Sequence, residues 1–337
     1  MPARAPTSGV AALARCREAL LVAAVLLACA APVAPAVSSA AASPSASNEG
    51  AAAPDSGGRT MADILAAAAP EDFRTPDPND TLYLELASGR VVIELAPRFA
   101  PNHVANVEAL AREGFYDGTA IVRVHENYVV QWADPDGTRP IRSAHRTLPA
   151  ELERPAAGLP FTRLAEPDTY ANEVGFSDGF PSARESATGA AWLVHCYGML
   201  GAGRDVAPDS GGGTELYVVI GHAPRHLDRN VTLLGRVLSG MERLTALPRG
   251  TAPLGFYEKA EQRVPIQHLR VAADVPPAER TELEILRSDS ATFQALVEAR
   301  RNRREEWFIR PAGHIDLCNV PLIVRTKQSD PTRPAGR

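Results

Sequence analysis

The residue that most needs a chemical explanation is Arg123, which stands between Val122 and Val124 in "FYDGTAIVRVHENYVVQWADPDG", residues 115–137. The stretch is typical of two short strands around a turn. A guanidinium keeps its charge in proteins and is costly to bury without a partner. Arg123 therefore predicts either an ion pair with an acid on a strand face or a functional site.

Two histidines and two cysteines form a second set of reactive side chains. His195 and Cys196 are adjacent, and His314 lies four residues before Cys318. These are zinc-ligand types, but the spacings differ from those of the usual zinc modules. In an exported chain, as argued below, cysteines can pair. We expect a Cys196–Cys318 disulfide first, free thiols second and zinc third, and we predict no metal and no cofactor.

Other catalytic patterns are weak. The glycine-rich runs "GAGRD" and "SGGGT" are not followed by a helix pattern with a lysine, so phosphate binding is not expected. No glycine pattern of a nucleophile elbow supports a serine hydrolase.

Charge and composition give a globular, mildly acidic protein. Of the 337 residues, 22% are charged, and the formal net charge is −5. Residues 1–28 hold three arginines and one glutamate, a net +2, so their removal changes −5 to −7. This balance gives no reason to expect nucleic acid as a partner.

Residues 1–40 have the pattern of a secretory signal peptide or a lipoprotein signal: arginines, an apolar core from Ala19 to Ala28, then small residues and prolines. The apolar core is too short for a comfortable membrane span. "LLAC", which ends at Cys29, resembles a lipobox, in which the cysteine is acylated. Cleavage near Ala36 or Ala40 is the alternative. We expect an exported chain, either periplasmic or anchored to a membrane as a lipoprotein.

Residues 41–78 are expected to be a flexible tether, in which "MADILAAAA", 61–69, can form a short helix, and regular strand and helix patterns begin after it. "TLYLELASGRVVIELAP", 81–97, alternates on both sides of a Ser-Gly turn and predicts a hairpin. "FAPNHVANVEALAREGFYDG", 99–118, has helical apolar spacing between a proline and a glycine. Further strands are expected within 215–221, 231–238 and 264–273, and a second helix over 239–247.

Two segments depart from this strand-rich pattern. Residues 135–190 are polar and rich in proline, and we expect an insertion with one or two turns of helix. Residues 275–326 have helical patterns in "PPAERTELEILR" and "SATFQALVEARRNRREEWF", and we expect a helical C-terminal extension before a disordered tail over 327–337.

A hairpin, a helix, further strands and a second helix fit a closed antiparallel β-barrel capped by two helices. The chain here resembles the cyclophilin-type peptidyl-prolyl cis-trans isomerases. Their "YxGTxFHRVxxxFMxQGGD" is similar to "YDGTAIVRVHENYVVQWADPDG", their "GxLSMA" to "GMLGAGRD", and their "LDGKxxVFGxV" to "LDRNVTLLGRV". The resemblance covers about 79–274 and implies a mainly β, cyclophilin-like domain over those residues.

The resemblance implies that Arg123 is the catalytic arginine, donating to the prolyl nitrogen when the twisted peptide bond leaves it with a basic lone pair. Gln131 matches the second catalytic position. The residues carried over as substrate-binding are Tyr128, Val129, Gly203, Arg204, Glu215, Tyr217 and Leu227.

Four positions depart from the family pattern. Val122 stands in place of a histidine, Glu215 in place of a glutamine, His226 where tryptophan or histidine is usual, and Val231 where many members have histidine. The Glu215 carboxylate could pair with Arg123 or Arg204, which would either hold the catalytic arginine or tie it up.

The predicted function is therefore peptidyl-prolyl cis-trans isomerisation of proline-containing segments of unfolded or maturing exported proteins. The alternative is a cyclophilin-like peptide-binding or scaffolding module with weak or no catalysis.

Overall fold

The structure is a computed structural model that describes residues 58–327. All of these residues belong to the compact unit Ala51–Arg337. The predicted signal segment, Cys29 and residues 328–337 lie outside the described residues.

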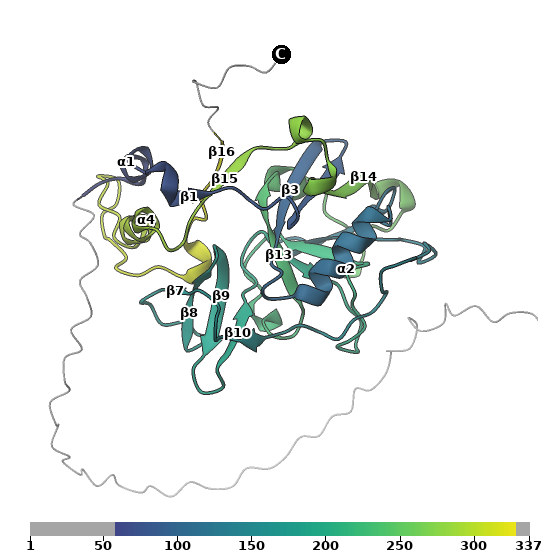
Figure 1. Ribbon diagram of the computed structural model, residues 1–337, viewed down its shortest axis with the longest axis horizontal. Coiled ribbons are helices and arrows are strands. Elements are labelled where there is room, and N and C mark those ends of the chain that lie inside the picture. Colours follow the sequence, from purple (N-terminus) through teal and green to yellow (C-terminus); the bar gives the residue numbers. More distant parts are fainter. Residues whose placement is uncertain (1–57, 328–337) are drawn as a thin grey trace, which may run out of the picture. The chain divides into compact units, whose positions relative to one another are not determined.

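A closed β-barrel of eight antiparallel strands forms the centre of this unit (Figure 1). Neighbouring strands around the barrel are β11 (Met199–Ala202), β12 (Leu216–Val219), β5 (Val129–Ala133), β4 (Ala120–Val124), β14 (Val264–Val271), β2 (Thr81–Leu86), β3 (Gly89–Leu95) and β13 (Leu233–Ser239). The closed barrel is the predicted fold class. The predicted hairpin is β2–β3, paired from Thr81–Glu94 to Leu86–Gly89.

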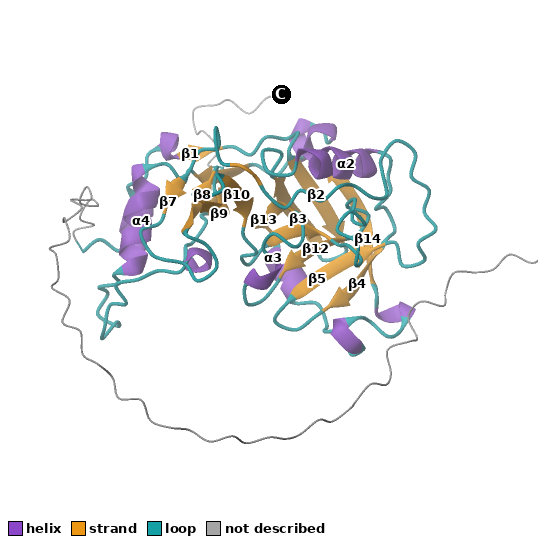
Figure 2. Cartoon of the chain, turned by 90° about the horizontal axis from the view of Figure 1, so that it is seen from below, coloured by secondary structure: helices purple, strands orange, loops and turns teal. Residues whose placement is uncertain are grey.

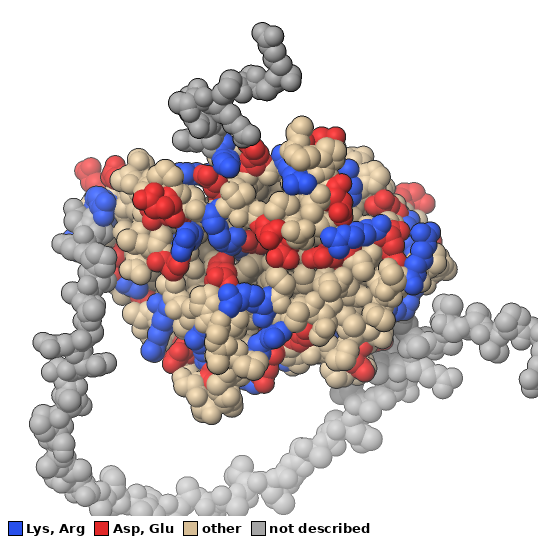
Figure 3. Space-filling model, viewed as in Figure 1, with Lys and Arg blue, Asp and Glu red and all other residues tan. Residues whose placement is uncertain are grey.

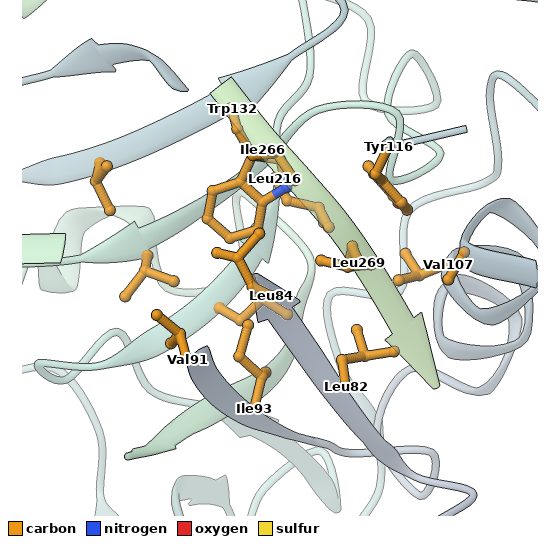
Figure 4. Packing of buried hydrophobic residues seen from close by; sticks show 14 of the residues in the cluster. Leu82, Leu84, Val91, Ile93, Val107, Tyr116, Trp132, Leu216, Ile266 and Leu269 are labelled. Carbon is orange, nitrogen blue, oxygen red and sulfur yellow. The ribbon is translucent and has the colours of Figure 1, made fainter. Parts of the chain in front are cut away.

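Alternating side chains of these strands fill the barrel. Leu84, Ile93, Trp132 and Ile266 are fully buried and lie together in its interior (Figure 4). Because successive side chains of a strand point to opposite faces, the residues between them point outward. The apolar interior thus fixes which residues of β4, β5 and β12 can face a ligand.

Helices accompany the barrel at two places. The predicted helix within 99–118 is α2 (Pro101–Arg112), whose buried Val104, Val107 and Leu110 belong to the barrel core. The second predicted helix is α3 (Met241–Thr245), which has only five residues and buries Leu244. The described 3-10 helices are Pro70–Asp72, Arg225–Leu227, Pro253–Gly255, Ala260–Gln262, Ala272–Asp274, Pro277–Glu279 and Leu317–Asn319.

The expectation of helical turns within 135–190 is wrong. Residues 154–193 instead form a second, five-stranded antiparallel sheet, which lies between the barrel and α4 in Figure 2. Its order is β6 (Arg154–Pro155), β10 (Ala190–Leu193), β9 (Phe180–Glu185), β8 (Glu173–Ser177) and β7 (Thr162–Arg163). Short strands separated by prolines and glycines give little periodicity, so the sequence pattern did not reveal them.

The C-terminal extension is only partly helical. "SATFQALVEARR" forms α4 (Ala291–Arg301), capped by the Ser290 hydroxyl. "TELEILR", which was expected to be helical, contains β15 (Leu283–Leu286) instead. This strand lies between β1 (Phe73–Arg74) and β16 (Val324–Thr326).

Residues 61–74 precede the barrel and are structured: the short helix expected within 61–69 is present, whereas β1 lies in a part that was expected to be flexible tether. They include α1 (Met61–Ala66), which contacts α4, and β1, which pairs with β15. Pairing with residues more than 200 positions later in the chain is invisible to a local pattern.

A second hydrophobic core joins the added sheet to α1, α4 and the C-terminal segment. Phe176, Trp192, Phe293 and Leu296 are buried in it. Cys196 also belongs to this core, and its sulfur is bonded to Cys318, 122 residues later. The pair forms a disulfide, the first of the three states considered from the sequence, so these sulfurs are not available as zinc ligands.

The surface carries both signs of charge. Basic and acidic side chains are interspersed over the face drawn in Figure 3, which is typical of a solvated surface. No helix within residues 58–327 is long and apolar enough to span a membrane.

Candidate active site

A row of outward-facing side chains crosses three neighbouring barrel strands, which lie together in Figure 2. On these three strands, Arg123 of β4 lies opposite Gln131 of β5, and Gln131 lies opposite Tyr217 of β12. Beyond the row, Tyr217 lies opposite Gly201 on a fourth strand, β11. Residues directly opposite each other on adjacent strands share a face. The strand register therefore brings together residues that are up to 94 positions apart in the sequence.

The Arg123 guanidinium is held by three groups. Its Nε donates to the Leu254 carbonyl oxygen at 2.6 Å, and Nη1 donates to Gln131 Oε1 at 3.1 Å. Its Nη2 lies 3.2 Å from His125 Nδ1, which must accept because a guanidinium only donates. Phe256 lies under the same group, with Cζ 5.4 Å from the ring centroid.

The positive charge of Arg123 has no acidic partner. No carboxylate of residues 58–327 lies within ion-pair distance of its guanidinium. Partial burial lowers the pKa of Arg123, and Tyr128 works in the opposite direction. The group is thus partly desolvated and oriented, while its charge is left uncompensated.

Glu215 acts on Gln131 and not on Arg123. Gln131 Nε2 donates to Glu215 Oε2 at 2.9 Å, while the amide oxygen of Gln131 faces Arg123. A carboxylate can only accept, so it fixes which end of the amide points at the guanidinium. The two pairings considered from the sequence, Glu215 with Arg123 or with Arg204, do not occur.

An apolar cluster lies beside this row. Val129, Tyr217 and Val219 are buried, and Tyr128 and Val231 pack against them. The Tyr128 ring stacks on His226 at a centroid distance of 6.4 Å, and the Arg123 Cζ lies 5.6 Å from its centroid. Apolar and aromatic surface next to a cation can receive a small ring with a polar atom at its edge.

Residues 81–271, more than half of the chain, match the family described as "Cyclophilin type peptidyl-prolyl cis-trans isomerase/CLD". The chain belongs to this family. The cyclophilin-type isomerase is 32% identical over 164 residues to "Peptidyl-prolyl cis-trans isomerase B" of Bacillus subtilis, which covers 48% of this chain and 86% of the relative. It is 26% identical over 198 residues to a "Probable peptidyl-prolyl cis-trans isomerase" of Brucella suis, with 56% and 81% of the two chains covered.

One solved structure extends the likeness beyond the family match. The crystal structure of cyclophilin AquaCyp293 from Hirschia baltica has a TM-score of 0.62 and 26% identity, and the match covers 80% of this chain and 99% of that one. The family match covers a smaller share of this chain, so the similarity reaches into residues outside 81–271.

Of the other residues carried over from the family pattern, Gly203 adjoins the row, because a Cβ there would lie 3.3 Å from Gln131 Nε2, whereas Arg204 and Leu227 lie outside the row. The Gly203 backbone N–H donates to the Glu215 carbonyl oxygen at 2.8 Å. The exposed Arg204 donates to the carbonyl oxygens of Asn230, Asp205 and Val206. Leu227 is half-buried in the 3-10 helix Arg225–Leu227 and is not a member of the apolar cluster.

The sequence analysis of this isomerase missed His125, Leu254 and Phe256 as neighbours of Arg123. His125 lies two residues after Arg123, and this strand spacing could have suggested it. Leu254 and Phe256 come from a loop about 130 residues later, for which no local signal exists. This loop reaches the site because the Tyr257 backbone N–H donates to the Val122 carbonyl oxygen at 3.0 Å.

We predict that Glu215→Gln changes kcat/KM for an X-Pro peptide by less than about five-fold, because the substitution alters one hydrogen bond to Gln131 and leaves the Arg123 partners in place. The cis-to-trans rate of a proline-containing test peptide measures the effect. A gain of ten-fold or more would show that the carboxylate restrains Arg123 in solution.

Proposed function

We propose that this isomerase catalyses cis-trans rotation of X-Pro bonds in exported proteins, with Arg123 as the electrophilic group and Gln131 as its partner. The observation that carries the proposal is the uncompensated Arg123 guanidinium, which is oriented beside an apolar cluster. Both features suit a substrate that offers an apolar ring and a developing lone pair.

The reaction needs no covalent bond to break. Rotation about the prolyl peptide bond passes through a twisted state, with a barrier of about 18–20 kcal/mol. In that state the nitrogen loses conjugation and gains a basic lone pair. A donor placed at this nitrogen binds the twisted state better than either planar isomer, and this lowers the barrier.

Arg123 retains donors for this role. A guanidinium carries five N–H groups. Three of them are directed at Leu254, Gln131 and His125. The two that remain can reach a substrate without breaking the contacts that hold the group in place.

The neighbouring apolar cluster supplies the proposed seat for the proline ring. Tyr128 and Val231 are partly exposed and lie over the buried Val129 and Tyr217. Contact with this surface is similar for both planar isomers and for the twisted state, so we assign it to binding and assign rate enhancement to Arg123.

Two features support the proposal that the substrates of this isomerase are exported proteins. The N-terminal pattern is that of a secretory or lipoprotein signal. Cys196 and Cys318 form a disulfide, a bond that persists mainly in oxidising compartments.

Expression of the full chain in a bacterial host tests the proposed location. We expect the mature protein in the exported fraction, without residues 1–28 or without a slightly longer segment that ends near Ala36 or Ala40. Mass spectrometry of its N-terminus decides between these, and Cys29→Ser moves an acylated form from the membrane fraction to the soluble one. A cytoplasmic chain that still begins at Met1 would refute export.

A further inference from the structure

A buried chain of hydrogen bonds leads inward from the proposed proline seat. The Tyr217 hydroxyl lies 2.9 Å from His195 Nε2, and His195 Nδ1 lies 2.9 Å from Asp228 Oδ1. His195 is 0% exposed and Tyr217 is 6% exposed. The tyrosine hydroxyl is therefore satisfied by the protein interior.

The positions of the protons on Tyr217 and His195 follow from Asp228, whose carboxylate accepts from His195. Asp228 Oδ1 also accepts from the His195 backbone N–H at 2.9 Å. Its carboxylate only accepts, so the His195 ring proton sits on Nδ1, and Nε2 accepts from the Tyr217 hydroxyl. Burial lowers the pKa of His195 despite the Asp228 hydrogen bond, and burial raises the pKa of Tyr217. Both side chains are neutral near neutral pH.

The outer end of the chain reaches the inserted sheet. Arg225 Nε donates to Asp228 Oδ2 at 2.6 Å, and its Nη1 and Nη2 donate to Asp168 at 2.7 and 3.0 Å. Burial opposes the charge on Arg225, but the hydrogen bonds that it donates to Asp168 and Asp228 and the charges of these carboxylates outweigh burial and raise the pKa of Arg225. The Asp228 that orients His195 is thus held by Arg225, and Arg225 is held in turn by Asp168, which lies between β7 and β8.

The Tyr217 and His195 rings are also enclosed by neighbouring parts of the chain. A side chain at Gly201 would place Cβ 2.3 Å from Tyr217 Cζ, so only glycine lets the ring cross β11. The His195 ring is nearly parallel to the Tyr217 ring, with an interplanar angle of 8°. The adjacent Cys196 is tied to Cys318 in the C-terminal extension. Both added segments therefore brace the residues behind Tyr217.

We propose that His195 is a positioning residue of this isomerase, which holds the Tyr217 hydroxyl inward so that the Tyr217 ring forms the floor of the proline seat. The inference rests on the proposed function, in which Tyr217 contributes to the seat. It assigns the inserted sheet a role in substrate binding through Asp168, Arg225 and Asp228.

A double-mutant cycle tests the proposal. His195→Leu leaves a buried hydroxyl without its acceptor, and we expect KM and the Kd for an X-Pro peptide to rise about five-fold or more with little change in kcat. Tyr217→Phe removes the donor as well. In that background His195→Leu should cost less than about two-fold, because no hydroxyl remains to satisfy.

Equal costs in both backgrounds would mean that His195 is only structural and would overturn the proposal, as would no cost in either. Kd is measured by titration calorimetry and does not depend on catalysis. An unmodified chain that binds the peptide without isomerising it would refute the role of Arg123, while the cycle in Kd would still decide the role of His195. An unmodified chain that does not bind the peptide would overturn both.

A pH profile gives a second readout. The groups that face His195 are Tyr217, Asp228, Arg225 and His226. Protonation turns Nε2 into a donor and leaves the Tyr217 hydroxyl proton without an acceptor. Because burial lowers the pKa of His195, KM should rise only when the pH falls clearly below the ordinary imidazole value of about 6.5. His195→Gln keeps an acceptor that does not titrate and should flatten this rise. His125 and His226 are present in both the unmodified chain and His195→Gln. If the two proteins have the same pH dependence of KM, the proposal is contradicted.

Discussion

Arg123→Ala is expected to lower kcat/KM for X-Pro isomerisation by about 10²–10³-fold, the typical cost of removing one donor from a preorganised site. Most of the loss should appear in kcat, because the donor acts on the twisted state and the apolar cluster that would bind the planar substrate stays in place. The cis-to-trans rate of a test peptide with residues 41–337 measures the effect.

Two further variants make this result specific. Arg123→Lys keeps a positive charge but loses the fork that reaches Leu254, Gln131 and His125 together, so it should recover only part of the activity. Arg163→Ala removes an exposed arginine from β7 and should leave the rate unchanged.

Activity that survives Arg123→Ala would overturn the assigned mechanism. The structure removes one reason to expect a catalytically inactive Arg123, because Glu215 contacts Gln131 and leaves the Arg123 charge uncompensated. An unmodified chain that binds X-Pro peptides but does not accelerate their isomerisation would favour the binding module considered from the sequence.

Removal of the Cys196–Cys318 disulfide should lower the free energy of unfolding by about 2–5 kcal/mol. The bond closes a loop with a sequence separation of 122 residues. Without it, the unfolded chain gains conformational freedom, and the C-terminal segment is held to the second core by apolar packing alone. We expect Tm to fall by roughly 10 °C.

The Cys196→Ala/Cys318→Ala double variant measures this effect without leaving a free thiol. Thermal and urea unfolding of the double variant are compared with those of the unmodified chain with and without a reductant. The reduced chain and the double variant should agree. A loss below about 1 kcal/mol would show that packing alone secures the C-terminal segment.

Local sequence patterns identified the parts of this protein in which neighbouring residues decide the structure. The alternation on both sides of Ser88-Gly89 predicted β2 and β3, and helical spacing after Pro101 predicted α2. Arg123 and Gln131 could also be singled out, because they stand in a long, ordered resemblance to one family. The strand and helix patterns repeat every two or every 3.6 residues, so they can be recognised without knowledge of distant partners.

The tertiary structure decided the parts that depend on residues far apart in the chain. The sheet over 154–193 and the pairing of β1 with β15 join short segments with little periodicity. The contact of Glu215 with Gln131 and not with Arg123 follows from the register of β4, β5 and β12 and from a loop that covers Arg123. A buried tyrosine hydroxyl needs a hydrogen-bond partner, and only folding brought His195 to the Tyr217 hydroxyl. Side-chain chemistry states which contacts a residue requires, and long-range packing selects which residue supplies them.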